Sequence, residues 1–313
     1  MAAVEIRPVE DEIAVARSLE IWNDVYPTMA ASKADRESHL AWCLGHAEYL
    51  ASLDGEPVGT GDIELHPDAA TPELAMVHVA VLPAARRRGA GTGLYQAVSA
   101  WAHGQGRTQL ETWVLDADSD GVTFAAARGF EEVFHDALVA LDLAGLEPPD
   151  VAPPSGIAIV TWAERPELAP GMYEVMCEAA PDIPGYDAGE PGYEEWVEHA
   201  LGAASDRPDA TFVALAGDEV VGYAKFHLSE ARPAVAVHDL TGVKRAWRGR
   251  GIARTLKATQ IAWAKREGYE RLETANELRN APIRKLNAEF GYQPIPRRAL
   301  VRGPIATTAG EAP

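Results

Sequence analysis

The sequence predicts a mixed α/β protein made of two similar domains in tandem, and three observations lead to this prediction. A basic, glycine-rich turn follows an apolar run twice, at residues 86–91 and 248–253. Other features recur at the same offset of 162 residues, such as Gly129-Phe130 and Gly291-Tyr292. A proline-rich stretch, 147–156, separates the two copies, and it is predicted to be a linker because clustered prolines prevent regular structure.

The repeated positions keep one register over roughly fifty residues. Trp101 corresponds to Trp263, and residues 110–112 and 272–274 both read Leu-Glu-Thr. Such agreement indicates an internal duplication, with a repeat too long for a solenoid. A length of 313 residues also favours two domains of ordinary size. We therefore expect one domain over 1–146, a second over 157–305, and a disordered tail over 306–313.

Hydrophobic periodicity and turn residues predict the elements of each half. In the first half these are strands over 3–8, 49–53, 58–65, 74–82, 108–115 and 133–143, and helices over 10–22, 33–44, 90–101 and 122–127. In the second half these are strands over 157–161, 211–216, 220–228, 235–243 and 272–274, and helices around 168–179, 193–203 and 252–263. Asp54-Gly55 is a hairpin turn signal between two of the strands.

Charge, cysteine content and hydropathy restrict the function. Residues 1–150 carry 9 basic and 25 acidic side chains, whereas residues 151–313 carry 19 and 22, which gives a total net charge of −19. An acidic first half opposes nonspecific nucleic-acid binding; it would attract a cationic amine, and the alternative is that it serves only to keep the protein soluble. No signal peptide or membrane span is visible. Cys43 and Cys177 have no metal-binding spacing, so we expect two reduced thiols, no metal and a cytoplasmic protein.

Both basic turns have the features of an anion-binding site. In the second half an apolar run leads into Arg248, Gly251 and Ala253, where a helical pattern begins. The first N–H groups of a helix have no partner inside the helix, and the helix dipole adds partial positive charge. Walker and dinucleotide-binding glycine patterns are absent. The remaining pattern, Arg-x-x-Gly-x-Ala, resembles the acetyl-CoA pyrophosphate loop of the GNAT N-acetyltransferase superfamily.

The resemblance covers nearly the whole chain, because each half has the element order of one GNAT fold. The layout is similar to that of tandem members such as mycothiol synthase, whose C-terminal half carries the chemistry. It implies acetyl-CoA as the cofactor, held by the turn and by a fourth strand that splays from the fifth. The implied contacts in the second half are Leu240, Thr241, Val243, Arg248, Gly249, Arg250, Gly251, Ile252, Ala253, Arg254 and Asn280. Those in the first half are Val79, Val81, Arg86, Arg87, Arg88, Gly89, Ala90 and Gly91, although three consecutive arginines also suit a solvated basic turn.

Acetyl transfer to an amine requires a neutral amine and a protonated leaving thiolate. Asp239 and His238 interrupt an apolar strand, and Glu273 lies on the next strand. We expect Asp239 to act as the base or as a substrate ligand, with bound water as the alternative base. Glu111 stands at the position equivalent to Glu273, so a structural hydrogen-bonding role suits Glu273 equally well.

The expected acid departs from the family pattern. Many GNAT enzymes have a tyrosine four residues before the last Gly-Phe/Tyr pair, where this chain has Asn287 and Ala125. Asn276, Asn280 and Asn287 resemble a GNAT subgroup that keeps asparagines. Asn287 is expected to orient the thioester, and Asn280 to contact the cofactor or to cap a helix. The first half lacks this polar set, so we expect it to be degenerate and regulatory.

These features together predict an N-acetyltransferase that modifies the primary amine of a small molecule through its second half, as a monomer or homodimer. One alternative is a CoA-binding sensor without turnover, which the missing tyrosine favours. Another is an enzyme that acetylates an exposed amine of a partner protein.

Overall fold

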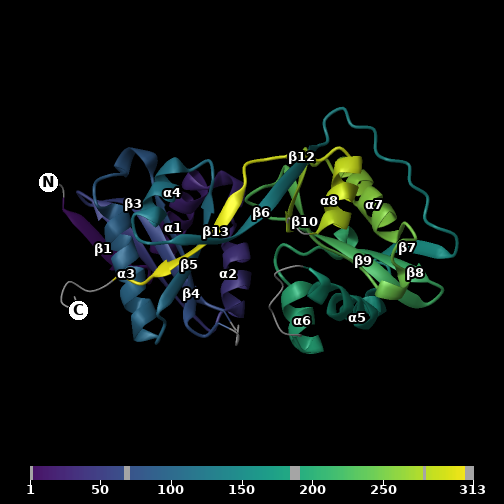
Figure 1. Cartoon of the computed structure of the whole chain (residues 1–313), viewed down its shortest axis with the longest axis horizontal. Helices are drawn as coiled ribbons and strands as arrows, with labels where there is room; N and C mark the ends of the chain where they lie inside the picture. Colours follow the sequence, from purple (N-terminus) through teal and green to yellow (C-terminus); the bar gives the residue numbers. More distant parts are fainter. Residues whose placement is uncertain (1–2, 67–70, 184–190, 278–279, 307–313) are drawn as a thin grey trace. The chain divides into compact units, whose positions relative to one another are not determined.

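The computed structural model describes residues 3–66, 71–183, 191–277 and 280–306 (Figure 1). The chain forms two compact units. Unit 1 contains Met1–His135 together with Arg298–Pro313, and unit 2 contains Asp136–Arg297. The division therefore differs from a simple split at the proline-rich linker.

Unit 1 is a six-stranded sheet with helices on both faces. Its helices are α1 (Glu12–Val25), α2 (Lys33–Trp42), α3 (Ala90–Gly104) and α4 (Ser119–Ala126). Its strands are β1 (Val4–Pro8), β2 (Gly45–Leu53), β3 (Glu56–Leu65), β4 (Leu74–Val81), β5 (Gln109–Leu115) and β13 (Arg298–Pro304), which pair in that order. Only β4 and β5 are parallel, and the other neighbours are antiparallel.

Unit 2 repeats this arrangement. Its helices are α5 (Ala169–Ala179), α6 (Tyr193–Ala200), α7 (Ile252–Arg266) and α8 (Ala281–Glu289). Its strands pair in the order β7 (Ile157–Thr161), β8 (Phe212–Ala216), β9 (Glu219–His227), β10 (Val235–Val243), β11 (Arg271–Glu277) and β6 (Glu131–Asp142), with the short β12 (Gln293–Pro294) on β6. Here β10 and β11 are the parallel pair.

The two repeats exchange their last strands, which corrects the predicted domain boundaries of 1–146 and 157–305. Residues 136–142 of β6 pair with β11 of unit 2, and β13 pairs with β5 of unit 1 (Figure 1). The two strands are equivalent in the repeat, since residues 136–142 and 298–304 differ by the same 162 positions. Each sheet therefore receives an equivalent antiparallel strand in the same register, with Arg302 opposite Glu111 in unit 1 and Asp142 opposite Arg271 in unit 2.

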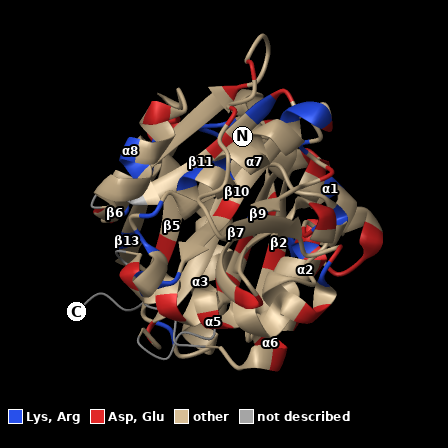
Figure 2. Ribbon diagram, turned by 90° about the vertical axis from the view of Figure 1, so that its right-hand side faces the viewer, with Lys and Arg blue, Asp and Glu red and all other residues tan. Residues whose placement is uncertain are grey.

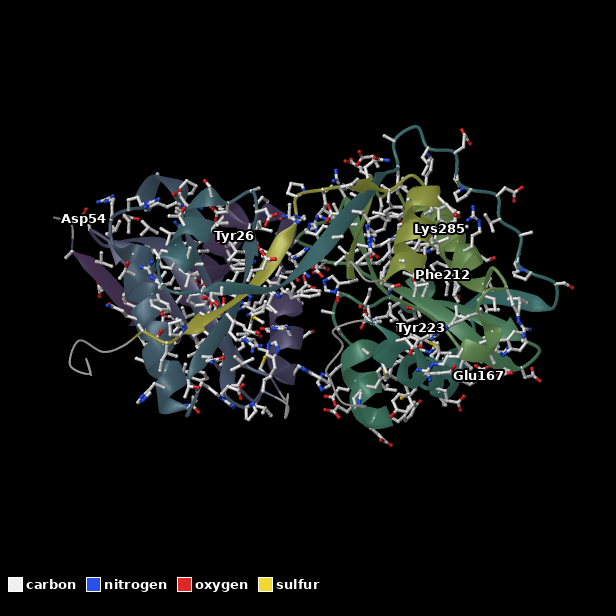
Figure 3. The ribbon with its side chains drawn as sticks, in the orientation of Figure 1. Tyr26, Asp54, Glu167, Phe212, Tyr223 and Lys285 are labelled. Carbon is white, nitrogen blue, oxygen red and sulfur yellow. The ribbon has the colours of Figure 1, made fainter. Side chains whose placement is uncertain are left out.

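The sheet of unit 2 buries one side-chain set on each face, as the alternation of a strand requires. Phe212 packs in a cluster with residues of α7, whereas Tyr223 packs with residues of α5 and α6 (Figure 3). The α7 face and the α5–α6 face are thus separate cores on one sheet.

The structure also bears on the predicted hairpin turn and the predicted C-terminal tail. Asp54 and Gly55 both have positive φ, 53° and 87°, which is the backbone of a type I′ turn, so the predicted hairpin is confirmed. Ala306 donates its N–H to Ser99 Oγ and is therefore ordered, while residues 307–313 of the predicted tail lie outside the described residues.

No helix in the described part of the chain is long and apolar enough to cross a membrane. Acidic positions outnumber basic ones and are spread over many elements (Figure 2).

Candidate active site

The two basic turns have the same backbone geometry. Each connects the fourth strand of its unit to a long helix, α3 or α7, and each has two residues with positive φ at equivalent positions. These are Arg87 (61°) and Gly89 (97°) in unit 1, and Gly249 (73°) and Gly251 (88°) in unit 2. Gly89 and Gly251 are the N-caps, and neither helix has a side-chain cap. The first N–H groups of both helices are therefore available to an anion.

The first arginine of each turn fastens the turn to the strand before it. Arg86 Nε donates to Val81 O at 3.1 Å, and Arg248 Nε donates to Val243 O at 2.9 Å. This bond occupies one edge of the guanidinium and leaves the Nη atoms pointing to nearby carboxylates. Arg86 and Arg248 therefore shape the turn as well as supplying charge.

Carboxylates neutralise both turns in different ways. In unit 1, Arg86 Nη1 lies 3.1 Å from Asp118 and 3.2 Å from Asp120. Asp118 is itself fixed as the N-cap of α4, because it accepts from Gly121 N. In unit 2, Asp182 bridges Arg245 and Arg248, whose hydrogen bonds lower the pKa of Asp182 to about 2. A phosphate entering either turn has to displace these carboxylates from the arginines.

The fourth and fifth strands of each unit separate after three paired residues. β4 pairs with β5 only through Leu74–Met76, and β10 pairs with β11 only through Val235–Val237. Both strands of each pair continue beyond this point, so β4 and β10 present an edge with no neighbour from the fifth strand. Such an edge offers N–H and C=O groups to an extended ligand, as β-strand addition does in peptide recognition.

Only β10 contains a bulge at the point of separation. His238 faces Phe226 and Thr241 faces Ala224, so Asp239 and Leu240 together oppose the single residue Lys225. A bulge leaves one residue unpaired and redirects its side chain. β4 pairs with β3 without any such shift. Because β10 has one extra residue, the offset of 162 does not hold before the bulge, and His238 is the residue equivalent to Val77.

The bulge places Asp239 beside a buried lysine. Lys225 Nζ lies 3.0 Å from Asp239 and 2.6 Å from Asp206. Burial opposes the charge of Lys225, but the two carboxylates outweigh it and raise its pKa. One lysine between two carboxylates leaves a net negative charge, and Asp239 keeps 48% of its side chain exposed. At the equivalent place in unit 1, His78 and Asp62 pair at 2.9 Å.

The two glutamates on the fifth strands form structural ion pairs. Glu273 accepts from Arg232 at 2.8 Å, and Arg271 lies 3.1 Å away, at an angle that makes it an ion pair rather than a hydrogen bond. Glu111 accepts two hydrogen bonds from Arg302. Both carboxylates are mostly buried and already paired with arginine. This geometry favours the structural alternative for Glu273 over a role as base.

The asparagines of unit 2 lie together on β11 and α8. Asn287 Nδ2 donates to Asn276 Oδ1 at 3.1 Å, and both side chains are buried. Within the described part of the chain, Asn287 Oδ1 and Asn276 Nδ2 have no hydrogen-bond partner. Buried amide atoms are rarely left unpaired, so these two suggest a missing ligand group. Asn280 occupies the N-cap position of α8 but makes no side-chain capping bond, which disfavours capping as its role.

A buried polar network behind β10 was not anticipated from the sequence. His238 Nδ1 lies 3.0 Å from Gln260 Oε1, and His238 Nε2 lies 2.5 Å from Tyr292 OH. Lys257 is fully buried on α7, with its Nζ 5.2 Å from the Tyr292 ring centre. Burial and the nearby Lys257 hold the pKa of His238 well below its ordinary value. Lys257 and Gln260, three residues apart on the apolar face of a helix, are the sequence signal that could have revealed this network.

Comparison with known proteins identifies the family. The model of the Acetyltransferase (GNAT) family matches residues 16–130 and 170–292. The chain belongs to the GNAT family. None of the curated proteins compared with it matches its sequence.

Solved structures of other GNAT proteins have the same two-unit fold. A tandem GNAT protein from the clavulanic acid biosynthesis pathway is 22% identical, with a TM-score of 0.78 over 98% of this chain and 100% of that one. A GCN5-related N-acetyltransferase from Sphaerobacter thermophilus is 20% identical, with a TM-score of 0.73 over 97% and 96% of the two chains. At these identities the likeness establishes the fold.

The remaining predicted contacts of this GNAT protein divide into buried and exposed positions. Ile252 and Ala90 belong to the cores, so only their backbone is available to a ligand. Arg250 donates to Ala246 O, and Arg254 pairs with Glu289. Val243 is also buried. The other predicted contact residues are partly or fully exposed: Val79, Val81, Arg87, Arg88, Gly89, Gly91, Leu240, Thr241, Gly249, Gly251 and Ala253.

A pocket of about 260 Å³ lies at the turn of unit 1. Its lining includes Val79, Arg86 and Gly89, together with Asp118 from α4. Tyr26 also lines it and donates to Val79 O at 3.3 Å (Figure 3). The pocket thus has both a phosphate-compatible turn and acidic groups that oppose a phosphate.

Proposed function

We propose that the protein is an N-acetyltransferase in which unit 2 transfers the acetyl group of acetyl-CoA to the primary amine of a small molecule. The bulge in β10 is the observation that carries this proposal. In this bulge two residues, Asp239 and Leu240, lie opposite the single residue Lys225, at the point where β10 separates from β11. Unit 1 has the gap and the turn, but its β4 pairs with β3 without a bulge.

The residues of unit 2 fit a CoA thioester. The turn at Arg248–Ala253 offers helix N–H groups to a pyrophosphate, and the unpaired edge of β10 offers hydrogen bonds to the amides of pantetheine. Asn276 and Asn287 have unpaired amide atoms suited to a carbonyl or an amide group. The bound thioester supplies an activated acetyl group, and the side chains around it have to position and deprotonate the amine.

Asp239 suits the amine end of the reaction. Its carboxylate is half exposed and lies 3.0 Å from Lys225 Nζ. An ammonium group drawn to the net negative Asp206–Lys225–Asp239 cluster can pass its proton to Asp239, directly or through water. Glu273 is engaged by arginine, so we assign it a structural role. Asn287 is assigned to orienting the thioester rather than to protonating the thiolate, because an amide is a poor proton donor.

Matched glycine variants test which unit carries the chemistry. Gly89→Glu and Gly251→Glu place the same carboxylate at the same helix position with the same positive φ. We expect Gly251→Glu to abolish acetyl-CoA-dependent thiol release across a panel of amines, and Gly89→Glu to retain it. Calorimetric titration with CoA should show the tighter site lost in Gly251→Glu. Activity that survives Gly251→Glu but not Gly89→Glu would assign catalysis to unit 1.

The same experiment separates the alternatives. CoA binding without thiol release on any amine would favour a sensor, for which the absent tyrosine and the self-neutralised turn of unit 1 are the supporting features. Acetylation confined to a peptide array would favour a protein substrate. We expect neither result, because the acidic cluster at Asp239 matches a small cation.

A further inference from the structure

A cluster of four metal-ligating side chains lies in unit 1, apart from the turn and its pocket. His39 lies in the last turn of α2 and Cys43 is its C-cap residue, while Glu64 lies near the end of β3 and His66 directly follows it. One ligating atom from each residue lies within 4.8 Å of all the others. The acyl-transfer chemistry proposed above uses none of these four residues.

The local structure brings the four side chains to one point. Residues four apart on a helix share a face, and residues two apart on a strand share a face. His39 and Cys43 have the first spacing, and Glu64 and His66 have the second. The Nε2 atoms of both histidines converge on the same oxygen, Glu64 Oε2, at 2.8 and 3.2 Å. Two imidazole nitrogens and a carboxylate oxygen, all donor types that zinc accepts, therefore lie next to one another.

We propose that His39, Cys43, Glu64 and His66 bind one Zn²⁺ ion. The mixture of imidazole, thiolate and carboxylate suits zinc and disfavours Mg²⁺ or Ca²⁺, which prefer oxygen ligands alone. In a tetrahedral zinc site, bond lengths of about 2.0–2.3 Å place the donor atoms roughly 3.3–3.8 Å apart. The observed spread of up to 4.8 Å closes by small side-chain rotations.

The charges also balance. Glu64 and a Cys43 thiolate cancel the two positive charges of the metal, while both histidines bind as neutral imidazoles. On binding, the Cys43 thiol forms a sulfur–zinc bond and releases its proton to solvent. Four protein ligands fill a tetrahedral shell, so the site is structural rather than catalytic.

The packing of α2 explains what such an ion would do. No residue of α2 is buried, so apolar packing holds this helix to the sheet only weakly. Ion pairs join α2 to β2 and β3, from Arg36 to Glu48 and from His39 to Glu64. A zinc ion would tie the end of α2 to the end of β3. The hairpin strands β3 and β9 correspond at an offset of 163 residues, as Glu56 and Glu219 do. At that offset unit 2 has His227 and Ser229 in place of Glu64 and His66, so the set is particular to unit 1.

Zinc titration of the tag-free, full-length protein, first stripped by a chelator, tests the proposal. We expect one Zn²⁺ per chain by calorimetry, and a higher thermal midpoint of unit 1 when the ion is bound. His39→Gln and Cys43→Ser should each weaken zinc binding by more than about 100-fold, beyond the 10–100-fold typical of residues that only support a ligand. Co²⁺ should give a thiolate-to-metal charge-transfer band that Cys43→Ser removes.

Matched controls make the result specific. Cys177→Ser changes the other free, half-buried thiol, and His103→Gln changes an exposed histidine outside the cluster. Both should bind zinc as the wild type does. Because His39 is half exposed, His39→Gln should fold normally. The proposal is overturned if the wild type binds no Zn²⁺, or if binding is unchanged in both His39→Gln and Cys43→Ser.

Discussion

Replacing Lys257 by methionine should stabilise unit 2 near neutral pH, and the gain should shrink as the pH rises. Lys257 is completely buried on α7, and its burial lowers its pKa from 10.5 to about 7. Among the described residues, no carboxylate forms an ion pair with it. Methionine has nearly the same length and carries no charge, so the substitution removes the cost of burying an amine while filling the same space.

The pH dependence follows from where the proton is bound. Between about pH 7 and 10.5 the unfolded chain keeps a proton on Lys257 that the folded chain has released, so the free energy of unfolding rises with pH. This contribution is complete above pH 10.5 and is lost as the pH falls to about 7. One proton changes the stability by about 1.4 kcal/mol per pH unit. The wild type should therefore gain roughly 2–3 kcal/mol from this residue between pH 7 and 9, a gain that Lys257→Met lacks.

Urea unfolding at pH 7, 8 and 9 measures the difference, with amide hydrogen exchange used to assign the transition to unit 2. Lys285→Met is the control, because Lys285 lies on α8 with 81% of its side chain exposed (Figure 3). Its effect on stability should be small and independent of pH. A stability difference between wild type and Lys257→Met that stays constant from pH 7 to 9 would refute the reasoning, as would a variant less stable than the wild type at pH 7.

Three further predictions concern the site and the exchanged strand. Asp239→Asn should lower kcat by about 10²–10⁴ and remove the acidic limb of the pH–rate profile if Asp239 is the base; a raised KM with an unchanged profile would instead make it a substrate ligand, and no change in either would leave the proton to water. Val301→Asp puts a charge into the core beneath β13 and should lower the free energy of unfolding of unit 1 by about 3 kcal/mol or more. Amide hydrogen exchange should show protection lost in β2 and β3 and kept in β8 and β9; loss confined to unit 2 would contradict the strand exchange. His238 has its pKa well below 6.5, so its contribution to stability should be lost as the pH falls below 6.5. His238→Gln should therefore make the free energy of unfolding fall less steeply with decreasing pH, as measured by circular dichroism.

Local sequence carried most of the information about the fold and the turns. Two residues with positive φ, an arginine bound to the preceding strand, and a helix that starts at once are all short-range features. They follow from the glycines and arginines at 86–91 and 248–253. The type I′ hairpin at Asp54-Gly55 and the duplication at one offset are readable for the same reason, since each depends on neighbours in the chain or on a repeated pattern.

The tertiary structure alone decided which sheet receives each last strand, where β10 bulges, and what surrounds each charge. Residues 136–142 and 298–304 form equivalent strands, so local preference cannot say which copy pairs with β5 and which with β11. The sequence does not reveal the extra residue in β10, because the spacing between equivalent residues of the two halves also differs by one residue elsewhere. Lys225, Lys257 and the cluster from His39 to His66 gain their properties from partners far apart in the chain. Burial and distance set those properties, and both exist only after the chain has folded.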